Sequence, residues 1–166
     1  MLDGCHPERS EGSQASSSLR SNNKLAELSG NSVMPPVHKL LLLDDLLAVC
    51  RLPAEAPAPK WVQGRALSAL IRTSEELTVV CPEHFVPPGV IAEPGWRALQ
   101  VEGPLDFELV GVLASLAASL ADAGVSIFAI STYSTDFILI KESQVDLAVT
   151  ALHQAGHQVR PLAPNP

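Results

Sequence analysis

The chain has 166 residues, 46% of them apolar, a length that suits one ordinary domain or two very small ones and excludes a large enzyme with a separate cofactor domain. Its 11 basic and 18 acidic residues give a net charge of -7, and no stretch gathers Lys or Arg. With only 4% aromatic residues, these features argue against a nucleic-acid partner. Three widely spaced cysteines without a signal peptide predict a cytoplasmic protein without a disulfide framework, and no apolar stretch predicts a membrane span.

Residues 1–33 are rich in serine and hold almost no clustered apolar side chains, so they are predicted to be a disordered tail. Residues 5–13 resemble translations of dispersed bacterial repeat DNA, which favours Met34 as the true start of a bacterial protein. A genuine flexible tail is the alternative. Residues 163–166 are predicted to be a second, short tail.

The first half of the chain is predicted to be made of short strands without long helices. Asp44 and Asp45 separate two apolar runs, which indicates either a hairpin turn or a bend in one long strand. A segment with four prolines then predicts a loop with at most one helical turn. In chain order the expected elements are strands at 37–43, 46–51, 65–72 and 77–81 and the loop at 82–95.

The second half predicts alternating strands and helices. Asp106 is the expected N-cap of a helix that ends near Gly124, and Ser143 the expected cap of a second helix that ends at Gly156. In chain order the strands are expected at 96–102, 125–131, 137–141 and 157–162, with a polar turn at 132–136. This order is the ferredoxin-like arrangement, with a four-stranded antiparallel sheet and both helices on one face.

Two separated motifs suggest a family. They are Arg72-Thr73-Ser74-Glu75-Glu76-Leu77 and Ile130-Ser131-Thr132-Tyr133-Ser134-Thr135-Asp136-Phe137, with Gly103-Pro104-Leu105-Asp106-Phe107 between them. Over residues 36–159 the chain resembles tandem ACT-domain proteins related to aspartokinase regulatory domains and to CASTOR-type cytosolic arginine sensors. The resemblance implies an α+β fold of two ferredoxin-like ACT units with antiparallel sheets, a reduced one at 34–95 and a second at 96–162. It also implies a free amino acid bound at an interface between ACT units.

Such a ligand carries a carboxylate and an ammonium, and each is costly to bury without a partner. The turn that begins at Gly103 leads into a helix N-terminus, whose free N–H groups suit the carboxylate. Asp136, beside Thr132 and Thr135, is the candidate partner of the ammonium. Two structural alternatives stand beside this interpretation: Asp106 caps its own helix, and Asp136 shapes an Asx turn.

The resemblance implies the remaining ligand-contacting positions. Arginine is not the expected ligand, because Leu109, beside Glu108, stands where the arginine sensors would have an acidic residue. Basic, hydroxyl and small apolar amino acids stay open. The implied positions are Leu105, Asp106, Phe107, Gly111, Val112, Thr132, Tyr133 and Asp136, with Thr78 and Val79 of the other ACT unit closing the pocket.

Other chemistry finds little support in the sequence. His153 and His157 lack accompanying metal ligands and are expected to be surface histidines, so no metal is predicted. Cys50 and Cys81 are expected to be buried and inert. No nucleophile lies beside a base, so neither an enzyme nor a cofactor is predicted. The sequence favours a regulatory module, a homo-oligomer such as a dimer with a regulated protein partner; the alternative is a ligand-free dimerisation or adaptor protein.

Overall fold

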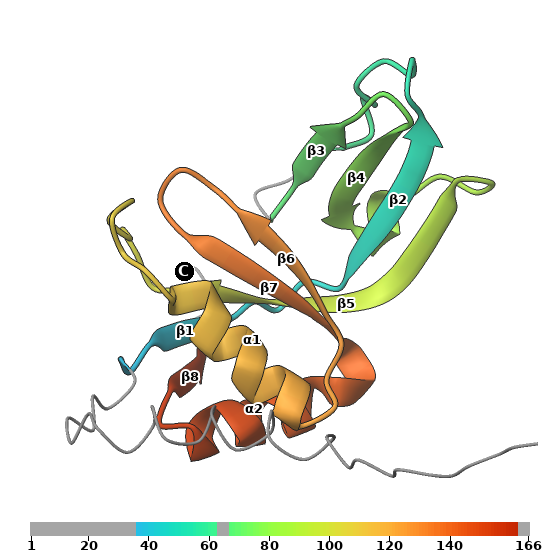
Figure 1. Ribbon diagram of the computed structural model, residues 1–166. Helices are drawn as coiled ribbons and strands as arrows, with labels where there is room; N and C mark the ends of the chain where they lie inside the picture. The colour runs from blue at the N-terminus through green and yellow to red at the C-terminus, as the bar shows by residue number, and fades with distance from the viewer. Residues whose placement is uncertain (1–35, 63–66, 163–166) are drawn as a thin grey trace, which may run out of the picture. The chain divides into compact units, whose positions relative to one another are not determined.

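The computed structural model describes residues 36–62 and 67–162, within one unit that spans residues 35–166 (Figure 1). The predicted tails at 1–33 and 163–166 lie outside the described residues. Eight strands form one sheet in the order β3-β4-β2-β5-β1-β8, with β7 on the other side of β5 and β6 beyond β7. The elements are β1 (Lys39–Leu42), β2 (Leu47–Pro53), β3 (Ala69–Arg72), β4 (Glu76–Pro82), η1 (Glu83–Phe85), β5 (Ile91–Val101), α1 (Val112–Asp122), β6 (Ile127–Ser131), β7 (Asp136–Lys141), η2 (Glu142–Gln144), α2 (Val145–Gln154) and β8 (Gln158–Pro161).

The long strand β5 organises the sheet. β1 and β2 both run antiparallel to β5 along the same edge, opposite residues 99–101 and 91–96. Asp44 and Asp45 therefore lie in a bend between two collinear strands and not in a hairpin turn. Arg97 fixes this bend, because its Nε donates to Leu43 O at 2.9 Å and its guanidinium lies 3.8 Å from the Asp44 carboxylate.

The second half of the chain forms the predicted ferredoxin-like unit, β5-α1-β6-β7-α2-β8, which confirms an α+β fold. Both helices cover one face of the sheet (Figure 1). The core between helices and sheet contains Leu99, Val101, Leu116, Leu120, Ile138, Ile140, Ala148 and Leu152. No helix among the described residues is both long and apolar enough to cross a membrane.

One strand of the sheet departs from the predicted four-stranded antiparallel arrangement. β1 lies between β5 and β8 and runs parallel to β8, so the sheet is mixed. Leu40 of β1 is fully buried in the core between the helices and the sheet. Burial of this apolar side chain favours the position of β1 between β5 and β8.

The first half of the described chain builds its sheet without an α-helix. β2, β3 and β4 pair antiparallel. Loop residues take the place of helices, since Trp61, Val62, Val86 and Val90 pack over the buried side chains of β2 and β4. β5 runs unbroken through residue 95, where the predicted boundary between two ACT units falls, so the two halves share this strand. The division into 34–95 and 96–162 stays a prediction.

Three local expectations were wrong. Residues 91–95 belong to β5, because β2 supplies their hydrogen-bond partners. α1 begins at Val112 and not after Asp106: the Asp106 side chain instead closes a turn with Glu108 N at 3.0 Å, and Gly111 takes the left-handed conformation (φ 87°) at the N-cap. Ser143 lies in η2, and Gln144 is the N-cap residue of α2.

Candidate functional site

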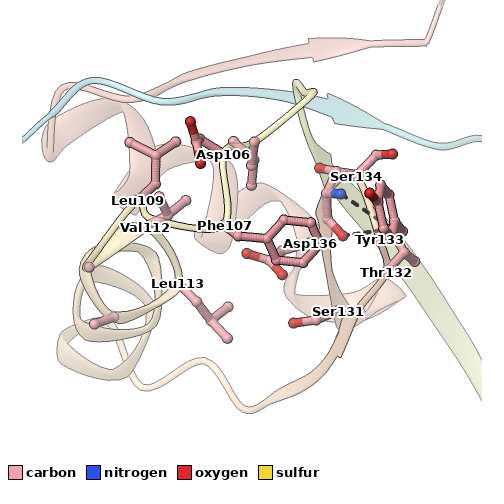
Figure 2. Close-up of a pocket in the computed structure, with 14 residues that line it drawn as sticks. Asp106, Phe107, Leu109, Val112, Leu113, Ser131, Thr132, Tyr133, Ser134 and Asp136 are labelled. Atoms are coloured by element: carbon pink, nitrogen blue, oxygen red, sulfur yellow. Dashed lines mark hydrogen bonds between the residues drawn. The ribbon is translucent and has the colours of Figure 1, made fainter.

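The two corners that the sequence pointed to enclose a pocket of about 340 Å³ (Figure 2). One wall is the loop after β5 with the first turn of α1, and the other is the turn between β6 and β7. The lining residues are Leu105, Asp106, Phe107, Leu109, Gly111, Val112, Leu113, Ala114, Ser131, Thr132, Tyr133, Ser134, Thr135 and Asp136.

Backbone and hydroxyl hydrogen bonds hold the two corners together. Leu105 N donates to Ser134 O at 2.8 Å, and the hydroxyl of Thr135, which is only 8% exposed, donates to Val101 O. Within the turn, Thr132 N and Thr132 Oγ1 both donate to Thr135 O at 2.8 Å. The pocket is therefore built on a rigid turn and not on a loose loop.

Gly103 is required where the corners meet. A Cβ atom at this position would lie 2.7 Å from Ser134 O, which is a backbone atom that cannot swing away. We expect Gly103→Ala to lower the free energy of unfolding by roughly 2 kcal/mol or more, because the corners must separate. Gly89→Ala, at a position with φ 87° and open space, is the matched control and is expected to cost about 1 kcal/mol. Urea unfolding of both variants measures the difference; equal losses would show that the close contact at Gly103 is not needed.

Two carboxylates give the pocket its charge. Asp106 and Asp136 line it, and no Lys, Arg or His does so among the residues described. Asp106 accepts a hydrogen bond from Glu108 N, so one of its oxygens is engaged in shaping the loop. Figure 2 shows the Asp136 carboxylate pointing into the space between α1 and the turn. Asp136 is thus the acidic group available to a cationic ligand group.

The opposite wall offers backbone donors. The first bond within α1 runs from Ser115 N to Gly111 O at 2.9 Å, so the N–H groups of Val112, Leu113 and Ala114 have no acceptor inside the helix. All three residues line the pocket. This end of α1 carries the partial positive charge of the helix dipole, which favours an anionic group.

Apolar side chains surround these polar groups and extend out of the pocket. Phe107 and Tyr133 meet edge to face, with ring centroids 5.1 Å apart across the pocket mouth, and are 75% and 83% exposed. Leu109 and Val110 on the same loop are also exposed. The pocket is therefore open, with an apolar rim.

Eight of the ten predicted site residues line this pocket: Leu105, Asp106, Phe107, Gly111, Val112, Thr132, Tyr133 and Asp136. The structure does not bring Thr78 and Val79 to it within one chain. The Val79 side chain is fully buried, and Thr78 lines a separate 290 Å³ pocket on β2, β4 and β5, where its hydroxyl donates to Glu76 Oε1 at 3.0 Å. The reason is the order of the strands, because β4 pairs only with β2 and β3 in the described chain.

Sequence reasoning missed five lining residues, and it named Thr135 only as a neighbour of Asp136. Ser131 and Ser134 belong to the same turn motif as Thr132 and Asp136, which was the available signal. Leu109 was considered only for its lack of charge. Leu113 and Ala114 lie within the expected helix and carry no signal of a site in the sequence.

The burial of the two cysteines matches the expectation from the sequence, whereas the burial of one histidine does not. Cys50 and Cys81 are buried and free, as predicted. Burial, with a smaller contribution from the neighbouring Cys50, raises the pKa of the Cys81 thiol to about 11. The expectation of surface histidines was wrong for His157, which is only 4% exposed and whose ring stacks on that of His38. In the described ranges no His, Cys, Asp or Glu cluster could hold a metal ion.

Comparisons with known proteins agree with this fold. Residues 91–154 match the ACT domain family, and residues 45–89 match a second family described as an N-terminal domain. The chain thus contains an ACT domain at residues 91–154, and its fold is similar to that of a regulatory subunit of aspartate kinase. Its described part adds no catalytic domain to that fold.

Three solved structures illustrate the similarity. Protein Atu0741 from Agobacterium tumefaciens is 29% identical, with a TM-score of 0.74 over 80% of this chain and 98% of that one. VC0802 from Vibrio cholerae, of unknown function and described as a possible transport protein, is 21% identical, with a TM-score of 0.60 over 71% and 89%. The regulatory subunit of aspartate kinase from Thermus flavus is 14% identical, with a TM-score of 0.53 over 74% and 99%, and shares the fold. No curated protein matches the chain in sequence.

Proposed function

We propose that this ACT-domain protein binds a free amino acid in the pocket between α1 and the turn that joins β6 to β7. The observation that carries the proposal is the placement of opposite charges on facing walls. The Asp136 carboxylate stands on one side, and the free N–H groups of the first turn of α1 stand on the other. A zwitterion has the two charges that such walls complement.

The apolar part of the pocket suits the rest of the ligand. Leu105, Phe107 and Leu113 line the space between the two charged regions. A volume of about 340 Å³ lies within the range of small-molecule sites in proteins. The two acidic side chains and the lack of a basic one in the lining favour a ligand that is not itself acidic.

We further propose that the chain is regulatory and acts as a dimer. A ligand that contacts both corners would fix Phe107 and Tyr133, whose rings stand exposed at the mouth. Another subunit or a regulated protein could recognise the exposed apolar rim in that fixed form. The fold similarity to a regulatory subunit of aspartate kinase is consistent with this role.

A ligand-free adaptor is the second candidate. The exposed apolar side chains of Phe107, Leu109, Val110 and Tyr133 favour it, because such patches mark protein-binding surfaces. β6 also pairs only with β7 in the described sheet, so its other edge is open. Both features would serve an adaptor without any small molecule.

A thermal-shift screen of the twenty amino acids against the whole chain separates the two functions. A ligand present at about 100 times its Kd adds about 2.7 kcal/mol of stability, which corresponds to a Tm rise of roughly 10 °C. We expect one chemical class of amino acid to produce this shift. If none of the twenty raises the Tm, the adaptor is the better description.

A further inference from the structure

Three of the four histidines in the described residues gather where the last strand meets the first. His38 directly precedes β1, His153 lies in the last turn of α2, and His157 directly precedes β8. The rings of His38 and His157 are stacked, with centroids 5.3 Å apart and an angle of 18° between their planes. We call these three side chains the histidine cluster.

Two members of the histidine cluster accept hydrogen bonds from the backbone. His38 N donates to His157 Nδ1, and Val159 N donates to His153 Nε2, both at 3.2 Å. A nitrogen can accept such a bond only while it carries no proton, since both nitrogens of an imidazolium are donors. The contacts around β8 therefore require neutral imidazoles.

Burial adds to this requirement. His157 is only 4% exposed, and Nε2 of His38 is buried without a hydrogen-bond partner in the described structure. Burial lowers the pKa of both histidines, and the neighbouring His38 lowers that of His157 further. A proton on either ring would place a cation against the stacked partner ring.

The charged groups of the surrounding elements do not offset such a proton. Alternation along the strands places Lys39 of β1 and Arg160 of β8 on the face opposite the core, and Arg160 pairs with Glu102 at the end of β5. Asp146 at the start of α2 and Asp122 at the end of α1 are exposed. None of these carboxylates bonds to the histidine cluster in the part of the chain that the structure describes.

We propose that the histidine cluster is an acid-sensitive latch that holds β8 against β1 and α2 at neutral pH and releases it in mild acid. Among the described residues, β8 joins the sheet only through β1, with bonds such as Gln158 N to His38 O at 2.9 Å. Protonation of His157 Nδ1 and His153 Nε2 removes the acceptors of the His38 and Val159 amides. The other edge of β1 bonds to Glu102, the residue before Gly103, so the latch lies one strand away from the pocket corner.

The direction of the pH effect follows from the lowered pKa values. The folded form binds fewer protons on His38 and His157 than the unfolded form, whose histidine pKa is near 6.5. The stabilisation is complete above pH 6.5 and is lost as the pH falls below that value toward the lowered pKa. Mild acid should therefore open β8 before it opens the rest of the sheet.

Amide hydrogen exchange of the whole chain, corrected for the intrinsic pH dependence, tests the latch. Between pH 7.5 and 5.5 we expect exchange at His38 and Val159 to accelerate about tenfold or more, because protonation removes the imidazole acceptor of each of these amides. The Val80 amide in β4 is the internal reference and should stay protected. In the same samples, NMR titration of the imidazole protons should place the midpoints of His38 and His157 below the ordinary histidine value of about 6.5.

A double variant, H153Q with H157N, keeps an acceptor atom at both places but cannot be protonated. We expect it to lose the selective acceleration at His38 and Val159, whereas the control variant H84Q keeps it. The proposal is overturned if the double variant retains the acceleration, or if His157 of the unmodified protein titrates at or above about pH 6.5, the ordinary histidine value. The second measurement needs no variant, so a folding defect in the double variant leaves the test intact.

Discussion

Replacing Asp136 with asparagine is expected to weaken amino acid binding by about 10- to 100-fold. The change keeps the shape of the side chain and removes the negative charge that faces the helix end across the pocket. A hydrogen bond to a charged group contributes roughly 1.5–3 kcal/mol, which corresponds to that range of affinity. Calorimetric titration with the amino acid that gives the largest thermal shift measures the loss.

Two comparisons make this result specific. Asp122→Asn removes the same charge from an exposed position at the end of α1, outside the pocket, and should leave the Kd unchanged. An N-acetylated form of the ligand, which lacks the ammonium, should bind poorly to the unmodified protein and no worse to the Asp136 variant. If Asp136→Asn binds the free amino acid as tightly as the Asp122 variant does, the ammonium lies elsewhere and the proposed orientation is wrong.

Truncating Leu116 to alanine is expected to cause the largest loss of stability. Leu116 is fully buried at the centre of α1, where it packs against the sheet. Removing a buried leucine side chain costs about 2–5 kcal/mol, because apolar contacts are lost and a cavity remains. Urea unfolding should show a lower midpoint with an unchanged m-value.

The same variant also probes the pocket, because Leu116 lies one turn after the helix end that lines it. Leu147→Ala on α2 is the matched control, since this leucine is 49% exposed and its truncation should change stability by about 0.5 kcal/mol. Equal losses in the two variants would mean that α1 is not anchored through Leu116. Ligand affinity should fall in the Leu116 variant and not in the control.

The pocket could be predicted because its parts are local in the chain. The turn from Thr132 to Thr135 is closed by hydrogen bonds between residues three apart, so the polar motif that specifies it is contiguous. The apolar stripe of α1 and the strand patterns on either side are periodic features that can be read residue by residue. Eight of the ten predicted residues came together for this reason.

The start of α1 could not be predicted from such patterns. Asp106 has the chemistry of a helix cap, and its side chain does accept a backbone hydrogen bond, but in a turn that ends before the helix. The left-handed conformation of Gly111 then sets the true N-cap. The six residues from Asp106 to Gly111 form a loop, and this loop opens the space in front of the N-terminal end of α1.

The sequence by itself determined the alternation of strands and helices from β5 to β8, the polar turn and the carboxylate in it. Only the tertiary structure decided that β1 enters between β5 and β8, that Thr78 lies away from the pocket, and that His157 is buried. Strand partners and register depend on which apolar faces remain uncovered once distant segments meet, and the spacing of residues within one segment does not contain that information.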